Sequence, residues 1–225
     1  MEFLKSHRYK ELRMILNSTL IKYCINGDEY KALALLECCY LDELFRVKNG
    51  DLILIFALKN NMLTLANKLL QSNDIDINEY DHYSMTALSI ACYNQQESIA
   101  LSILEFPEIN CNHVDDFGNT ALIIACQYNL EKVVSKLLEF DDLNYNYANG
   151  GGVSALIIAC TNDMESVVFK LLEKKDININ QRNILGYTPF ITACEYNCKS
   201  IALKLLEKEN INYNEILPDP PAHQH

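Results

Sequence analysis

The fold is decided by one short stretch, DDFGNTAL at residues 115–122, and by its copies along the chain. The copies recur at intervals of 34 residues: DHYSMTAL at 81–88, NGGGVSAL at 149–156 and NILGYTPF at 183–190. Each copy places a Thr or Ser directly before an apolar run, which is typical of a helix N-cap. In the last copy Pro189 follows the cap, and proline suits the first helical position. Each copy therefore predicts a turn that leads into a helix.

Three further columns of residues keep the same 34-residue step. Alanine–cysteine pairs lie in the predicted helix, with cysteines at Cys92, Cys126, Cys160 and Cys194. Paired aliphatic residues follow at Leu35-Leu36, Leu69-Leu70, Ile103-Leu104, Leu137-Leu138, Leu171-Leu172 and Leu205-Leu206. Asparagine closes the unit at Asn78, Asn112, Asn146, Asn180 and Asn214. Columns that stay in phase over this length identify internal repeats, and repeats of this size build solenoids.

Each repeat predicts two helices and an extended hairpin. The second helix has one apolar stripe, as at Val133, Leu137 and Leu138. The first helix ends at a column of residue types that mostly tolerate a left-handed backbone. That column consists of Gly27, Asn61, Gln95, Asn129, Asp163 and Asn197, of which only Gln95 departs from the expected types. The hairpins turn at Gly118, Gly152 and Gly186.

This unit resembles the ankyrin repeat, which combines Asp-x-x-Gly-x-Thr-Pro-Leu with an alanine-rich first helix, a Leu-Leu second helix and a closing asparagine. Residues 115–122 match that pattern closely and residues 183–190 match it well, whereas Ser84 replaces the usual glycine. The histidine that usually follows Thr-Pro-Leu is replaced in every copy, by Ser89, Ile123, Ile157 and Ile191. The resemblance implies an all-α ankyrin-repeat solenoid with helix-turn-helix units, and a non-catalytic protein–protein interaction module.

The same step extends toward the N-terminus in a degenerate form. An open solenoid end must cover its apolar face, so residues 1–16 are expected to form a capping helix. The prolines after residue 217 cannot continue a helix. The predicted organisation is a cap at 1–16, degenerate repeats at 17–50 and 51–80, repeats at 81–114, 115–148, 149–182 and 183–214, and a disordered tail at 215–225.

Composition excludes several classes of function. The 225 residues are 49% hydrophobic and carry a formal net charge of −11, which favours a packed core and disfavours nucleic acid. The longest apolar run, Leu52 to Leu58, is too short to span a membrane. Nine cysteines without a secretory signal favour a reducing compartment. We therefore expect a cytoplasmic monomer that contacts neither membrane nor nucleic acid.

Candidate chemistry is sparse. The four cysteines in phase are expected to be buried packing residues. Neither Cys38-Cys39 nor Cys111 has the spacing of metal ligands. The glycine run 150–152 precedes a helix but lacks the lysine of a phosphate-binding loop. The sequence therefore predicts no enzyme, no metal and no cofactor.

The family resemblance also implies which positions contact a partner, namely the hairpin tips and the ends of the first helices along a concave groove. Six of the twenty positions carried over are aromatic, against 9% of the chain, and interfaces favour aromatic residues. The alternative is that these tyrosines pack on neighbouring hairpins. The predicted contact residues are His82, Tyr83, Met85, Tyr93, Asp116, Phe117, Asn119, Gln127, Tyr128, Ile184, Leu185, Tyr187, Glu195 and Tyr196.

Charge suggests what the partner carries. Residues 69–131 contain ten acidic side chains and no lysine or arginine. This asymmetry favours a protein partner with a basic face, and an acidic surface that serves only solubility explains it equally well.

Three further expectations concern the biological setting. The alternative function is an adaptor, such as a ubiquitin-ligase substrate adaptor, whose N-terminal segment of about 50 residues recruits machinery while the repeats bind cargo.

Asn78 resembles the ankyrin asparagines that some hydroxylases modify, with Leu70 eight residues earlier. Frequent Asn, Ile, Lys and Tyr are typical of an AT-rich genome, as in a large virus, an intracellular pathogen or a protist. In such a source the partner would be a host protein, bound in the host cytosol.

Overall fold

The computed structural model describes residues 15–16, 18–38, 53–71 and 75–212. Most of the predicted capping helix, the link between the first two repeats and the predicted tail lie outside these residues. The chain divides into two compact units, Met1–Ile109 and Asn110–His225, and each is described by itself. The predicted boundaries of the individual repeats stay predictions.

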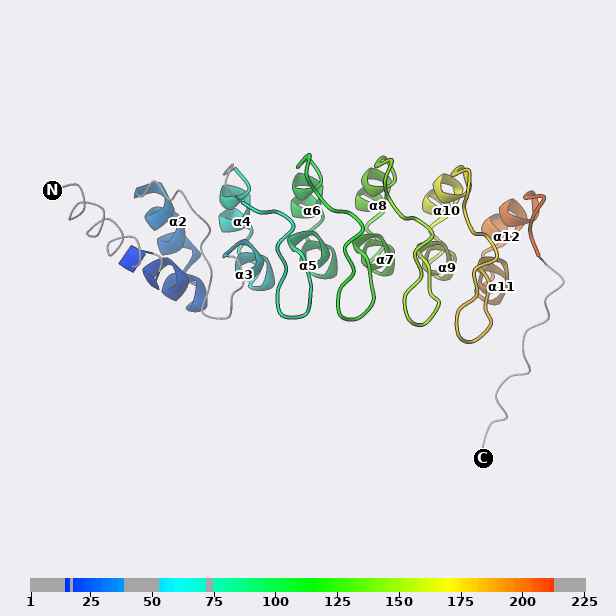
Figure 1. Ribbon diagram of the computed structural model, residues 1–225, viewed down its shortest axis with the longest axis horizontal. Helices are drawn as coiled ribbons and strands as arrows, with labels where there is room; N and C mark the ends of the chain where they lie inside the picture. The colour runs from blue at the N-terminus through cyan, green and yellow to red at the C-terminus, as the bar shows by residue number, and fades with distance from the viewer. Residues whose placement is uncertain (1–14, 17, 39–52, 72–74, 213–225) are drawn as a thin grey trace, which may run out of the picture. The chain divides into compact units, whose positions relative to one another are not determined.

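Unit 1 is built from paired helices. Residues 18–25 are helical and precede α2 (Glu29–Cys38). The next two pairs are α3 (Ile53–Lys59) with α4 (Leu63–Leu69), and α5 (Ala87–Tyr93) with α6 (Glu97–Ile103). Helix α3 packs on α5, and α4 packs on α2 and α6, so neighbouring pairs stack through like helices (Figure 1).

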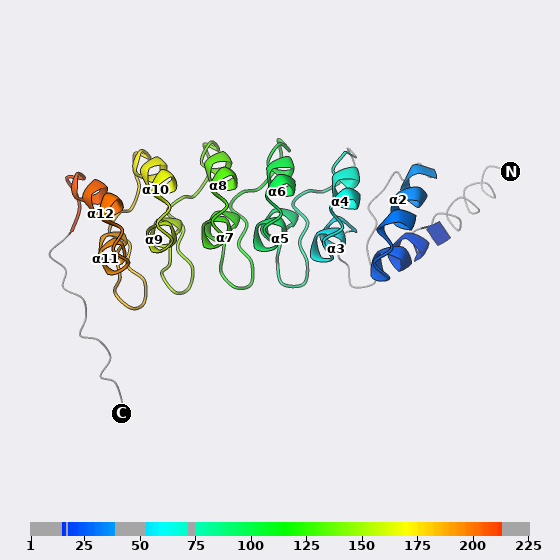
Figure 2. The same ribbon diagram turned by 180° about the vertical axis from the view of Figure 1, so that it is seen from behind.

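Unit 2 repeats the same arrangement. Its pairs are α7 (Ala121–Gln127) with α8 (Glu131–Leu137), α9 (Ala155–Thr161) with α10 (Glu165–Leu172), and α11 (Pro189–Glu195) with α12 (Lys199–Leu206). The first helices α7, α9 and α11 form one layer and the second helices α8, α10 and α12 form the other, as seen from both sides (Figures 1 and 2). The predicted all-α solenoid of helix-turn-helix units is confirmed.

Local backbone chemistry explains where the first helices begin and end. Thr86, Thr120, Ser154 and Thr188 each accept a hydrogen bond from the backbone N–H three residues later, and Pro189 occupies the first helical turn. The stop column adopts a left-handed backbone throughout, with φ between 53° and 57° at its non-glycine members. Gln95, the exception by residue type, has φ 57° like the others. Position in the repeat therefore outweighs residue preference there.

The core lies between the two helix layers. Cys92, Cys126 and Cys160 are fully buried, and burial raises the pKa of the Cys126 thiol to about 12, which makes it a poor nucleophile. The prediction that all four cysteines are buried is wrong for Cys194, which is exposed. Among the described residues, no further helix pair packs over α11 and α12, so the last cysteine lacks the cover that its counterparts have.

The closing asparagines link consecutive repeats. In unit 2 the Asn112 side chain donates through Nδ2 to Asp142 O at 2.8 Å and accepts from Asn144 N at 2.7 Å. Asn146 and Asn180 make the same pair of bonds 34 and 68 residues later. In unit 1 Asn78 Nδ2 donates to Glu108 O at 2.7 Å. A side chain that both donates to and accepts from backbone satisfies groups that the loops leave unpaired, which explains the repeated asparagine.

Candidate functional site

The hairpins between helix pairs are shaped by the residue that opens each one. In unit 1 Asp81 Oδ1 accepts from Tyr83 N at 2.9 Å and from Met85 N at 2.8 Å. Asp115, Asn149 and Asn183 make the equivalent two bonds in unit 2, at 2.8 to 3.0 Å. This role was not predicted from the sequence, although the Asp or Asn at the first position of each repeated stretch is typical of such turns.

The fourth residue of each hairpin has a left-handed backbone. Gly118, Gly152 and Gly186 have φ between 70° and 82° in unit 2, whereas unit 1 uses Ser84 at φ 56°. A side chain in this conformation costs about 1 kcal/mol because Cβ crowds the backbone. The hairpin of unit 1 therefore has the same geometry as the others at a higher conformational cost.

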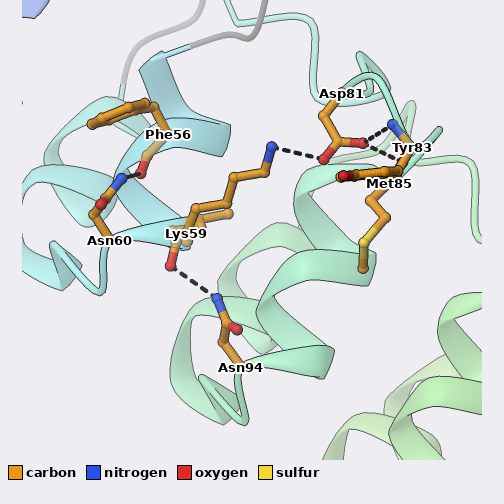
Figure 3. Close-up of polar contacts among 8 residues, drawn as sticks. Phe56, Lys59, Asn60, Asp81, Tyr83, Met85 and Asn94 are labelled. Carbon is orange, nitrogen blue, oxygen red and sulfur yellow. Dashed lines mark hydrogen bonds and ion pairs between the residues drawn. The ribbon is translucent and has the colours of Figure 1, made fainter. Parts of the chain in front are cut away.

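An ion pair supports the hairpin of unit 1. Lys59, at the end of α3, places Nζ 2.7 Å from Asp81 Oδ2, and the Asp81 side chain is fully buried (Figure 3). Burial alone would raise the pKa of Asp81. The Lys59 ammonium and the N–H groups of Met85 and Tyr83 outweigh that effect and lower the pKa below its ordinary value. Asp81 is therefore a charged side chain committed to holding the hairpin.

The hairpins of unit 2 are linked to one another. Asn149 Nδ2 donates to Asn119 Oδ1 at 3.0 Å, and Ile184 N donates to Gly151 O at 2.9 Å. A Cβ added to Gly152 would lie 2.5 Å from Arg182 O, so the next hairpin passes directly against this glycine. These contacts connect the three hairpins of unit 2 in a row and hold their tips in place.

The predicted contact residues differ in accessibility. In unit 1 His82, Tyr83 and Tyr93 are exposed, but Met85 is buried and offers little surface to a partner. In unit 2 the exposed members are Asp116, Phe117, Gln127, Ile184, Leu185, Glu195 and Tyr196, and the half-buried members are Asn119, Tyr128 and Tyr187. Ile184 is 79% exposed, and Phe117 and Leu185 are each 64% exposed, which is unusual for large apolar side chains.

The family model for ankyrin repeats matches this chain in three copies, over residues 54–149, 100–183 and 143–216. The chain belongs to the ankyrin repeat family. The match covers most of the chain, and it detects only ankyrin repeats and no catalytic domain. Comparison with curated proteins gives no match. Ankyrin repeats are in general protein–protein interaction modules, so the family supports protein binding without naming a partner.

The two layers of the ankyrin repeats in unit 2 differ in their lysine content. Between residues 110 and 212 every lysine lies in a second helix or in the loop directly after one: Lys132, Lys136, Lys170, Lys174, Lys175, Lys199, Lys204 and Lys208. The first helices and hairpins carry none. Lysine is depleted from protein interfaces and keeps surfaces hydrated, so this distribution marks the second helices as the solvated layer.

The ankyrin second helices form a shallow depression that several of these lysines line. It has a volume of about 470 Å³ and is bounded by Ser135, Leu138, Glu139, Lys170, Glu173 and Lys174. Lys170 Nζ donates to Ser135 Oγ, and Lys174 Nζ donates to Leu138 O, both at 2.6 Å. Both lysines thus join consecutive helix pairs, because each donates a hydrogen bond to a residue of the preceding pair.

The described residues of the ankyrin units show neither a metal-binding cluster nor a membrane-spanning helix. The part of the chain that the structure describes contains no group of three or more His, Cys, Asp or Glu residues placed to hold a metal ion. Over the same residues, no helix combines the length and apolar character that crossing a bilayer requires. The hairpin tips and first-helix ends are the candidate functional surface of each unit because they carry exposed aromatic and aliphatic side chains.

Proposed function

We propose that the chain is a non-catalytic module that binds a protein partner through the groove face of its ankyrin repeats, formed in each unit by the hairpin tips and first-helix ends. The observation that carries the proposal is the contrast between the two layers. In unit 2 the hairpins and first-helix ends expose Phe117, Ile184, Leu185 and Tyr196 and carry no lysine. The second helices and the loops directly after them carry all the lysines between residues 110 and 212, and expose large apolar side chains only at Leu203 and Leu206 of α12. Protein interfaces have the first composition and avoid the second.

The backbone under this surface favours binding as well. The tips are fixed by the opening Asp or Asn, and in unit 2 by bonds between neighbouring hairpins. At the first-helix ends, Asn94 Nδ2 donates to Leu58 O in unit 1, and Asn162 Nδ2 donates to Cys126 O in unit 2, both at 3.0 Å. Contacts held in place before binding lose little entropy when a partner arrives.

The proposed contact set contains the predicted residues that are accessible. In unit 1 it consists of His82, Tyr83 and Tyr93, without the buried Met85. In unit 2 it consists of Asp116, Phe117, Asn119, Gln127, Tyr128, Ile184, Leu185, Tyr187, Glu195 and Tyr196. The exposed aromatic and aliphatic members are the proposed anchors. Tyr128 and Tyr187, which are half-buried, combine packing with contact.

The test is a paired affinity capture from a cell lysate with mass spectrometry. The inner variant replaces Tyr83, Phe117 and Tyr187 by Ser, and a matched outer variant replaces Tyr30, Leu203 and Leu206 by Ser. We expect the inner variant to lose at least about 2 kcal/mol of affinity, roughly 30-fold, for a partner that the outer variant retains. Equal retention by both variants would sink the proposal.

A second variant guards against a trivial loss of folding. Gly150 is exposed, its backbone is not left-handed, and a Cβ there meets no atom within 4 Å. Gly150→Arg therefore adds bulk to the middle tip of unit 2 without straining the chain. We expect this substitution to weaken binding of the same partner while the circular dichroism spectrum and the thermal unfolding midpoint stay at wild-type values.

The adaptor is the second candidate, and one observation favours it. In the N-terminal part of unit 1, Tyr30 is 83% exposed and Ile25 is 60% exposed, which offers an apolar surface separate from the hairpins. Under this proposal Tyr30→Ser loses a recruited protein and keeps the cargo. Deletion of residues 1–16 separates the roles: lost solubility indicates a cap, and lost recruitment with intact cargo binding indicates an adaptor.

Hydroxylation of Asn78 is a smaller proposal of the same kind. Its side chain is half-buried and bonded to Glu108 O, so an asparaginyl hydroxylase must first open that bond. Incubation with such an enzyme should add the mass of one oxygen atom to the peptide that contains Asn78. An unchanged intact mass would retire the idea.

A further inference from the structure

We infer that the hairpin at residues 80–86 binds a partner segment that presents an arginine side chain to the rings of Tyr80, His82 and Tyr83. The inference rests on the proposed function and names the partner chemistry for one hairpin of unit 1.

The first support is the concentration of accessible rings. Tyr80 is 54% exposed, Tyr83 is 48% exposed, and His82 between them is also exposed. The centroids of the His82 and Tyr83 rings lie 3.9 Å apart with an angle of 44° between the ring planes. Electron-rich ring faces attract cations, and tyrosine faces stack well with a planar guanidinium group.

The second support is that hydrogen bonds and an ion pair hold the backbone of the hairpin in place. Tyr80 pairs with Thr86 in an antiparallel bridge, and Asp81 accepts two backbone N–H groups while it is ion-paired to Lys59. Figure 3 shows Lys59 reaching Asp81 from the neighbouring helix, beside Tyr83 and Met85. The backbone that carries the rings is therefore set before a partner arrives.

The third support is the charge of the repeat that carries the rings. The repeat that contains this hairpin has no lysine or arginine between residues 75 and 109. Its acidic residues are Asp76, Glu79, Asp81, Glu97, Glu105 and Glu108. The nearby cation Lys59 lies 2.7 Å from Asp81, so it neutralises that carboxylate. The charged side chains between residues 75 and 109 are all acidic, which favours a cationic partner side chain over an anionic one.

The unit 2 hairpins lack this combination. Their exposed large apolar side chains are Val114, Phe117, Ile184 and Leu185, and Arg182 adds a positive charge at the start of the last one. They suit apolar side chains of a partner. Arginine is therefore assigned to the hairpin of unit 1, and it is favoured over lysine because its planar group is less strongly hydrated and stacks on rings.

The test uses the full chain and synthetic glycine–serine peptides with spaced arginines, with lysine and glutamate peptides as matched probes. Binding is followed by titration calorimetry and by the NMR signals of residues 79–86. We expect the arginine peptide to bind more tightly than the lysine peptide and the glutamate peptide not to bind. Affinity should fall as salt is raised, because the attraction is electrostatic.

Variants locate the binding. Tyr80→Ser with Tyr83→Ser should weaken binding of the arginine peptide about tenfold, whereas Tyr80→Phe with Tyr83→Phe should retain the binding because the ring faces remain. Phe117→Ser should leave it unchanged. Absence of binding, equal binding of the glutamate peptide, or full binding by the Ser variant would each overturn the inference. The proposed function would still stand if the inner variant lost its captured partner while the arginine peptide failed to bind.

Discussion

The hairpin of unit 1 and the hairpins of unit 2 reach the same geometry with different chemistry. Unit 1 uses a serine at the left-handed position and a charged Asp81 paired with Lys59. Unit 2 uses glycine at that position, and its last two hairpins open with neutral Asn149 and Asn183. Two features are common to all, namely an acceptor that receives two N–H groups and a left-handed fourth residue. These two features therefore define the turn, while the charge of the opening residue and the exposed side chains differ from one hairpin to the next.

The largest effect is expected where one hairpin of unit 2 passes against the next. In Gly152→Ala the new Cβ would lie 2.5 Å from Arg182 O and 2.9 Å from Asn183 Cα. Because both are backbone atoms, the hairpins must separate, and we expect a loss of about 3 kcal/mol of unfolding free energy. Gly118→Ala has the same left-handed strain but no contact below 3.6 Å, so it should cost about 1 kcal/mol. Urea unfolding compares the two, and equal losses would contradict the close approach.

The next effect concerns the ion pair of unit 1. Lys59→Met leaves the buried Asp81 carboxylate without its cation, and we expect a loss of about 2 kcal/mol in urea unfolding. Adding Asp81→Asn should recover most of that loss, because Asn149 and Asn183 show that the neutral amide forms the same hairpin. A double variant no more stable than Lys59→Met alone would mean that the charge itself holds the turn.

Lowering the pH should distinguish a hairpin that opens with Asp81 from one that opens with a neutral asparagine. The pKa of Asp81 is lowered in the folded chain, so its contribution is complete above the ordinary aspartate value of about 3.9 and is lost as pH falls below it. Wild type should therefore lose more stability than Asp81→Asn between neutral pH and about pH 3. Thermal unfolding at stepped pH measures this difference, and parallel pH profiles would refute the assignment.

The smallest effect is expected at Ser84. Its φ of 56° costs energy that glycine avoids, although glycine also gains freedom in the unfolded chain. Ser84→Gly should stabilise the chain by about 0.5 kcal/mol, and Gly186→Ser in unit 2 should do the reverse. A destabilised Ser84→Gly would show that the serine side chain makes a contact worth more than the strain.

Sequence reasoning succeeded where the cause is local. The N-caps at Thr86, Thr120, Ser154 and Thr188 each depend on a hydrogen bond between residues three positions apart, so a periodic sequence pattern predicts them. The left-handed stop column depends on the same short range. Gln95 adopts that conformation although its residue type does not predict it, and the side chains of Asn94 and Gln96 on either side of it both donate to Leu58 O of the preceding helix pair.

Features that depend on contacts between different repeats could not be predicted from the sequence. The Lys59–Asp81 pair joins a helix end to the following hairpin, and the bond from Ile184 N to Gly151 O joins two hairpins. Neither leaves a periodic signal, since lysine does not recur at the equivalent position. The burial of Met85 and the exposure of Cys194 depend likewise on which neighbours cover each side chain.

The central claim is that the hairpins and first-helix ends, rather than the second helices, meet the partner. Hydrogen exchange of the full chain, measured with and without the captured partner, tests it most directly. We expect slower exchange in the partner complex at residues 82–85, 116–119, 150–153 and 184–187. Protection confined to α8, α10 and α12 would contradict it.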